Sequence, residues 1–204
     1  MSLDSILRND NPNTVIAKIK SEDKEVLKVT YGSRNLFDIN TLNSTYDLGN
    51  CSIVEQTTNG FILQGNQGNI DDSNGFSNGW FRPGLRDTTM YLKAGSVVTI
   101  SADYTALEFR YTTDRTETMN KIGVYLFANP TDGNVNLYNI NNIVDTENKL
   151  YKVTATFTIK KDSLYFPVFT LNSNKVKIEN IQIEYGSNAT AYVPYSRETV
   201  WAKS

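Results

Sequence analysis

The sequence contains no histidine and a single cysteine, Cys51, among its 204 residues. The absence of histidine excludes catalytic pairs of the Ser-His and Cys-His types, as well as zinc sites that use histidine. One cysteine excludes an internal disulfide, so stability has to come from packing, as suits assembly in a reducing cytosol. Glycoside hydrolysis needs only two carboxylates and is the enzymatic reaction that stays open.

The chain also lacks an excess of charge and a long apolar run. Its 20 Lys and Arg residues nearly balance its 22 Asp and Glu residues, and the net charge is −2. This balance argues against a polyanion-binding surface, so we expect no nucleic-acid partner. No apolar segment reaches the roughly 20 residues that span a bilayer, and the N-terminus does not resemble a secretion signal. We therefore expect neither export by a signal peptide nor membrane insertion.

Short apolar runs separated by clusters of Asn, Ser, Gly and Thr predict an all-β chain, long enough for one main domain. In residues 98–106 the even-numbered positions are apolar, and in residues 152–159 the odd-numbered positions are apolar. This alternation is typical of half-buried strands. Residues 164–169 predict a strand that is buried on both faces, with Pro167 at an edge or a bulge.

Three zones follow from the pattern. Residues 1–33 contain a hairpin signal, with apolar runs at 14–20 and 25–31. An isolated hairpin is marginal in water, so it has to pack on the main domain or on another molecule. Two interpretations of this hairpin remain: it anchors the protein in an assembly, or it adds an extra edge to a sheet of the main domain. Residues 34–195 form the predicted sandwich, and residues 196–204 form a tail whose Trp201 either docks or is disordered.

The end of the sandwich zone predicts its last strand. Apolar residues have even numbers up to Ile178 and odd numbers from Ile181, so the buried face changes register between them. A β-bulge at Glu179–Asn180 is the simplest explanation. The strand should end at the Gly-Ser-Asn triplet of residues 186–188, after which Pro194 favours an extended segment that returns along the sandwich.

This terminal motif resembles the closing strand of jelly-roll, carbohydrate-binding-like domains in phage tail-fibre and baseplate proteins. The matching residues are Ile178, Asn180, Ile181, Gln182, Glu184, Gly186, Ala189, Thr190, Tyr192, Pro194 and Tyr195. The opening motif, Arg34–Asp38, resembles the start that these domains share, and residues 91–104 and 151–158 resemble their middle strands. The resemblance implies an all-β, carbohydrate-binding-module-like jelly-roll β-sandwich with a short N-terminal β-hairpin extension.

The same resemblance implies a component of a phage tail, tail fibre or baseplate, or of a phage-derived tail-like particle. We predict a non-catalytic adhesion module, located in the virion tail, that binds bacterial cell-wall polysaccharide on the host. Its other partners would be tail and baseplate proteins, and a homo-oligomer such as a trimer would be its assembled state. The particle would assemble in the host cytoplasm and leave by lysis. The alternative is a purely structural tail protein with no glycan ligand.

A sugar site needs aromatic faces for the apolar side of a pyranose and polar groups for its hydroxyls. The candidate ligand-binding residues are Trp80, Arg82, Asp103, Arg110 and Tyr125. Trp80 and Arg82 share strand parity, so both face outward if Phe81 faces the core. The alternative, in which Trp80 fills the core, stays open.

Catalytic and metal sites have weaker support. Carboxylates that could flank a glycosidic bond are Asp71, Asp72, Asp103, Glu108, Asp114 and Glu117. A chain with 22 acidic residues always offers such candidates, so we predict no enzymatic activity. Asp71 and Asp72 could ligate a structural Ca²⁺, but turn formation explains the same residues without a metal. We therefore predict no cofactor.

Overall fold

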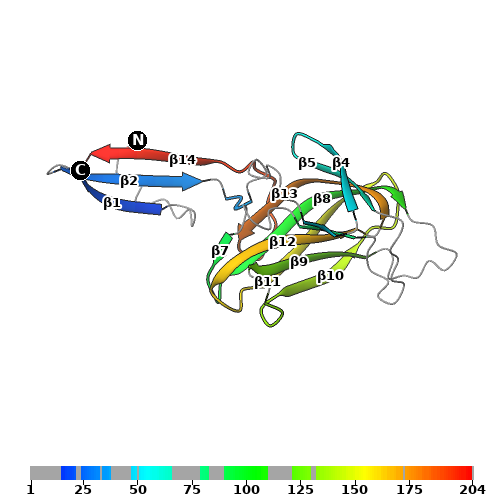
Figure 1. The fold of residues 1–204 in the computed structure, drawn as a ribbon. Helices are drawn as coiled ribbons and strands as arrows, with labels where there is room; N and C mark the ends of the chain where they lie inside the picture. The colour runs from blue at the N-terminus through cyan, green and yellow to red at the C-terminus, as the bar shows by residue number, and fades with distance from the viewer. Residues whose placement is uncertain are drawn as a thin grey trace.

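The computed structural model describes residues 15–21, 24–32, 34–37, 47–49, 51–65, 79–82, 90–109, 121–129, 132–171 and 173–203. These residues form antiparallel strands in three sheets, and no helix occurs among them (Figure 1). The described part of the chain accordingly contains no helix suited to crossing a membrane.

Two of the sheets stack as the layers of a sandwich (Figure 1). The six-stranded sheet has the order β10 (Leu137–Ile143), β9 (Lys121–Asn129), β12 (Ser163–Leu171), β6 (Gly79–Arg82) and β3 (Asp47–Gly49), with β7 (Met90–Leu92) also paired to β12. The five-stranded sheet has the order β11 (Leu150–Thr158), β8 (Val97–Phe109), β13 (Ser173–Tyr185), β5 (Gly60–Gly65) and β4 (Cys51–Gln56). Because consecutive strands repeatedly change layer, the protein is an all-β jelly-roll sandwich.

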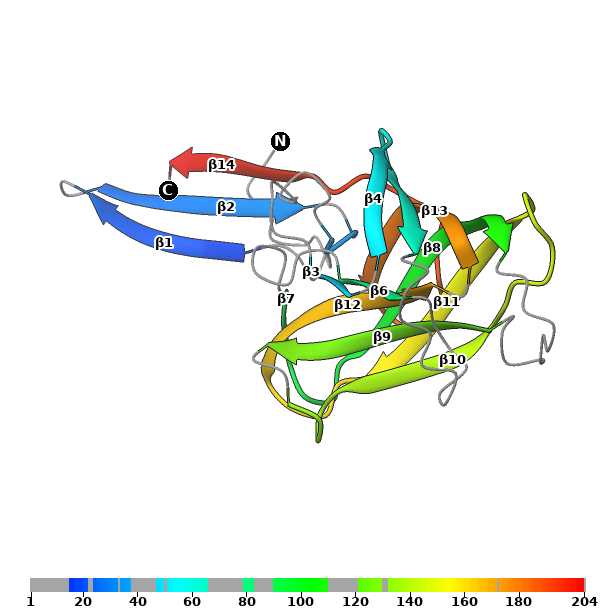
Figure 2. The same ribbon diagram turned by 45° about the vertical axis from the view of Figure 1, so that its right-hand side comes forward.

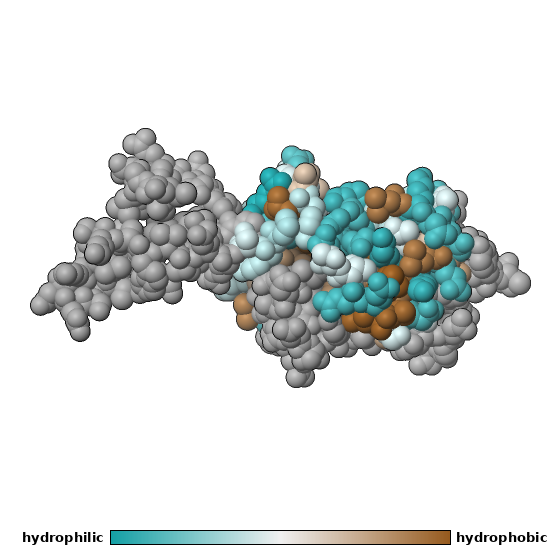
Figure 3. All heavy atoms as spheres, turned by 90° about the horizontal axis from the view of Figure 1, so that it is seen from above, coloured by the Kyte–Doolittle hydropathy of each residue, from teal (hydrophilic) through white to brown (hydrophobic). Residues whose placement is uncertain are grey.

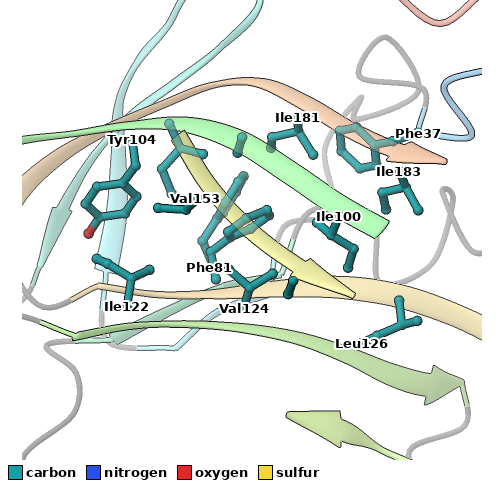
Figure 4. Close-up of a cluster of buried hydrophobic side chains, with 14 of the residues drawn as sticks. Phe37, Phe81, Ile100, Tyr104, Ile122, Val124, Leu126, Val153, Ile181 and Ile183 are labelled. Atoms are coloured by element: carbon teal, nitrogen blue, oxygen red, sulfur yellow. The ribbon is translucent and has the colours of Figure 1, made fainter. Parts of the chain in front are cut away.

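The hydrophobic core fills the space between these layers. Figure 4 shows Ile122, Val124 and Leu126 of β9 pointing into the same space as Ile100 and Tyr104 of β8. All five are fully buried. Phe61 of β5 meets Phe81 of β6 edge to face across the core, with ring centroids 5.1 Å apart. Such pairs add stability beyond the area that they bury.

The two predicted alternating strands are confirmed as β8 and β11. In β11 the side chains of Val153, Ala155 and Phe157 are buried, Tyr151 is half-buried, and the even-numbered side chains are exposed. The even-numbered side chains from Val98 to Ala106 in β8 are also buried, but Thr99 and Ser101 on its polar side are buried too. The Thr99 hydroxyl donates to the Gly186 carbonyl (2.8 Å), so the chain that follows β13 passes over the start of β8. This strand is therefore more deeply buried than its sequence predicts.

Pro167 lies inside the sheet, within the central strand β12. On one side β12 pairs continuously with β9. On the other side, β7 pairs with residues 163–165 of β12 and β6 pairs with residues 169–171. Strand pairing on this side of β12 therefore stops at Tyr165 and resumes at Phe169. A proline is tolerated where the ladder is interrupted. The predicted edge exists only locally, as the gap between two short strands.

The predicted bulge in β13 is confirmed. Glu179 pairs with Asp103 and Gln182 pairs with Ser101, so β13 has one residue more than β8 in this interval. Asn180 takes up the extra residue with a positive φ of 52°. Its backbone N–H donates to the Asn59 carbonyl (2.9 Å), and its Nδ2 donates to Asp103 Oδ2 (2.6 Å).

The third sheet joins the two ends of the chain. The predicted hairpin is confirmed as β1 (Val15–Ser21) and β2 (Lys24–Gly32). The tail supplies β14 (Arg197–Lys203), which pairs along β2 from Arg197 opposite Gly32 to Lys203 opposite Val26. The alternation of the sequence did not predict this third strand. Figures 1 and 2 show the three-stranded sheet extending away from one end of the sandwich.

The opening and terminal motifs meet in one hydrogen-bonded group, which we call the polar latch (Arg34, Asn35, Gln182, Glu184 and Thr190). Gln182 and Glu184 are buried polar residues of β13. Thr190 donates to the Glu184 carboxylate from its backbone N–H (2.8 Å) and from its hydroxyl (2.7 Å). Gln182 donates to Glu184 (2.8 Å) and accepts from the Val193 N–H (2.8 Å). The segment before Pro194 thus returns along β13, as predicted.

Asn35 forms the other half of the latch. Its Oδ1 accepts the backbone N–H groups of Phe37 and Ile183, each at 3.0 Å. Its Nδ2 donates to the carbonyls of Ile181 (3.1 Å) and Val193 (3.2 Å). The first residues of the sandwich are therefore fixed to its last strand, and the Asn of the opening motif has a structural role.

Glu184 is ionised within this group. Burial opposes its charge, but the hydrogen bonds from Thr190 and Gln182 and the nearby Arg34 guanidinium outweigh this effect. The pKa of Glu184 is therefore lowered below its ordinary value. Arg34 Nε lies 4.0 Å from the carboxylate, and Arg34 Nη2 donates to the Ala191 carbonyl (2.7 Å).

Candidate functional site

The outer face of the six-stranded sheet carries a second apolar cluster. In β9 the residues that face the core alternate with Tyr125 and Phe127. The register places Tyr125 opposite Val168 and Phe127 opposite Phe166 of β12, and these four residues form the cluster. On the other side of β9, Tyr138 of β10 lies opposite Tyr125. Figure 2 shows β10, β9 and β12 running side by side.

Four rings form a continuous group, which we call the outer aromatic cluster (Tyr125, Phe127, Tyr138 and Phe166). Tyr125 and Phe127 are stacked, with centroids 5.7 Å apart and planes within 7°. Tyr138 meets both edge to face, at 5.3 Å and 5.4 Å. Phe127 meets Phe166 edge to face at 6.1 Å. These are the offset and edge-to-face geometries that aromatic pairs prefer.

Exposure rises across the cluster from β12 to β10. Phe166 is fully buried, Tyr125 is 9% exposed and Tyr138 is 57% exposed. Phe127 is partly exposed. Burial, and to a smaller extent the neighbouring Tyr138, raises the pKa of the Tyr125 hydroxyl. Tyr138 and Phe127 are therefore the rings that a ligand can contact, whereas Tyr125 mainly supports them.

Arg82 lies on the same face of the same sheet. Phe81 points into the core, so the next residue in β6 points away from it. The Arg82 side chain is half-buried. Three strand spacings separate β6 from β10, which puts their backbones about 14 Å apart. Arg82 can therefore contribute charge and donors to this face, but at a distance from the exposed ring of Tyr138.

Two of the predicted residues, Trp80 and Arg110, have side chains that the structure does not describe. Trp80 has its backbone in β6, opposite Thr170, while its side chain lies outside what the structure describes. Arg110 lies outside the described residues. Whether Trp80 faces outward or fills the core stays a prediction.

Asp103 has to be separated from this site. It belongs to β8, in the five-stranded sheet, whereas Arg82 and Tyr125 belong to the other layer. Its carboxylate accepts from Lys152 Nζ (3.2 Å) and from Asn180 Nδ2 (2.6 Å). Asp103 therefore stabilises the β13 bulge. Figure 3, which looks onto the side where β4, β5 and β13 lie, shows a mainly hydrophilic surface with separate apolar patches.

Sequence reasoning missed Phe127, Tyr138 and Phe166. Phe127 has the parity of Tyr125 in the same strand, so alternation alone could have found it. Tyr138 and Phe166 become neighbours only through the strand order β10-β9-β12, for which the sequence carries no local signal.

Of the acidic candidates, Asp71, Asp72, Asp114 and Glu117 lie outside the described residues, and so does the proposed calcium loop. Within the described ranges, no group of three or more His, Cys, Asp and Glu side chains could hold a metal ion.

Comparison with known proteins gives structural likenesses alone. No protein-family model matches the sequence, and no curated protein matches it. The CBM22-1 xylan-binding domain from Paenibacillus barcinonensis aligns over 83% of this chain and 100% of that domain, with 12% identity and a TM-score of 0.45. A CBM4 structure aligns over 78% of this chain and 87% of its own length, with 12% identity and a TM-score of 0.45.

A third likeness is to the enzymatically active domain of bacteriophage CBA120 tailspike protein 4. It covers 87% of this chain and 20% of that protein, with 7% identity and a TM-score of 0.37. At these identities the likenesses concern the arrangement of strands and carry no ligand or activity over to this chain.

Proposed function

We propose that this protein is a non-catalytic glycan-binding module whose ligand contacts Tyr138 and Phe127. The observation that carries the proposal is the outer aromatic cluster, in which an exposed ring is held by edge-to-face contacts with two others. A ring fixed in this way loses little conformational freedom when a ligand binds, and preorganisation of this kind favours affinity. The half-buried Arg82 supplies donors for hydroxyl or anionic groups on the same face.

We further propose that the module acts in a phage tail, tail fibre or baseplate, or in a phage-derived tail-like particle, and binds the host cell wall. The support is the resemblance of the opening and terminal motifs to tail modules. A single platform of this size binds weakly, and many copies on one particle raise the avidity through effective concentration. Other tail proteins and further copies of this chain are the expected partners.

The test uses the whole 204-residue chain, clustered on beads, with purified cell walls from a panel of bacterial strains. We expect binding that disappears when wall polysaccharide is stripped, and a loss of at least about five-fold per site in Tyr138→Ala. Leu150→Ala is the matched control, because Leu150 is 62% exposed but lies on β11 of the other sheet. Leu150→Ala should keep the wild-type Tm, and Tyr138→Ala should lower it by only a few degrees, because it loses two edge-to-face contacts of a ring that is 57% exposed.

The second candidate is a structural tail component with no glycan ligand. The burial of Phe166 and Tyr125 favours it, because a cluster that is mostly buried can serve packing alone. Absence of binding to every wall tested, with a folded and clustered protein, would replace the first proposal by this one.

A further inference from the structure

Gly123 lies two residues before Tyr125 on the same face of β9, and the tyrosine ring covers it. A Cβ atom added at Gly123 would lie 2.4 Å from the Tyr125 hydroxyl oxygen and 2.5 Å from Cζ of the ring. Real Cβ atoms do not approach other atoms this closely. Gly123 does not have a positive φ, so the strand conformation alone does not require glycine here. What the position requires is the absence of a side chain.

The sheet is irregular on both sides of Gly123. The ladder between β9 and β12 ends at Val124, and the Gly123 N–H donates to the Thr170 hydroxyl (2.7 Å). On the other side, the register of β10 shifts between Asn139 and Asn142, opposite this part of β9. Regular strand pairing is thus interrupted on both sides of β9 at Gly123.

We propose that Gly123 is the positioning residue of the outer aromatic cluster: its missing side chain lets Tyr125 lean along β9, and this orientation sets Phe127 and Tyr138. This inference rests on the proposed glycan site and identifies what shapes it. Tyr125 stacks on Phe127, and Tyr138 packs against both rings. A displaced Tyr125 therefore moves the two rings that a ligand can contact.

The test compares Gly123→Ala with Gly133→Ala in the full chain. Gly133 is exposed, lacks a positive φ, and has no atom within 4 Å of an added Cβ, so it is a matched control. Alanine leaves the unfolded chain fewer conformations than glycine does, so an unobstructed substitution at a φ that alanine can adopt does not destabilise. We expect Gly123→Ala to lower Tm by about 3–10 °C, as overpacking does, and Gly133→Ala to leave it unchanged.

Two further readouts separate positioning from general destabilisation. Near-ultraviolet circular dichroism should change in Gly123→Ala, and the raised pKa of the Tyr125 hydroxyl, followed by NMR of ring-labelled tyrosine, should fall as this ring becomes solvated. In a Tyr125→Ala background the same glycine substitution should cost little further Tm, because the clash has been removed. An undiminished loss of Tm in that background would overturn the inference.

The wall-binding assay distinguishes this inference from the proposed function. If wild type binds and Gly123→Ala binds equally well, Gly123 does not position the site and the inference fails alone. If wild type binds no wall, the proposed function fails. The spectroscopic and double-mutant results then still decide whether Gly123 positions Tyr125.

Discussion

Glu184 shows how one side chain can join distant parts of this chain. Its carboxylate accepts hydrogen bonds from Gln182 and Thr190 and lies near Arg34, which begins the sandwich. Its pKa in the folded state lies below the ordinary value of 4.5. As the pH falls, the unfolded chain takes up the proton first. The stabilisation is therefore fully present above pH 4.5 and is lost as the pH falls through the folded pKa.

We expect Glu184→Gln to lower the free energy of unfolding at pH 7 by about 1–3 kcal/mol, because partners of the carboxylate lose a charged acceptor. The variant should also lose less stability than wild type between pH 5 and pH 3. Urea denaturation at stepped pH measures both effects. Glu55→Gln, on the exposed part of β4, is the control. An acid dependence identical to that of wild type would show that Glu184 does not contribute.

Strands are the scale at which the sequence is most informative. Alternation located β8 and β11, and the parity change after Ile178 located the bulge in β13, because side-chain period and register are local properties. The candidate site was harder to predict. Side-chain chemistry alone groups Tyr125 with Asp103, but strand order puts them in different layers. Strand order depends on non-local pairing, which a single sequence does not display.

The bulge gives a prediction at the same scale. Asn180→Ala and Asn180→Gly both remove the hydrogen bond to Asp103 and differ only by a Cβ at a φ of 52°. We expect the alanine variant to be less stable by about 1 kcal/mol, because positive φ disfavours residues with a Cβ. Chemical denaturation measures the difference. Lys177 has no positive φ, so the order of stability should reverse there: Lys177→Ala should be more stable than Lys177→Gly. The same order at both positions would contradict this explanation.

In the molecule as a whole, the sandwich and the three-stranded terminal sheet are separate parts. The chain passes from one part to the other beside the polar latch. The pairing of β14 with β2 adds the third strand of the terminal sheet. Neither strand pairs with the sandwich sheets. Loss of this pairing should therefore affect the terminal sheet while the sandwich stays folded.

Adjacent proline substitutions in β14 test this separation. Alternate N–H groups of an edge strand face its partner, so one of Thr199→Pro and Val200→Pro removes a bond to β2 and the other is its control. We expect one variant to increase hydrogen exchange in Lys24–Gly32, with protection in β8 and β13 unchanged. An equal increase in β8 would mean that the two parts unfold as one unit.

The pairing of Gly32 with Arg197 also has a consequence for modularity. The sandwich is inserted between two neighbouring strands of one sheet, and its two ends leave side by side. Domains whose ends lie close together tolerate insertion and exchange, because the host structure keeps its own geometry. One inserted sandwich can therefore be replaced by another while the terminal sheet keeps its own structure.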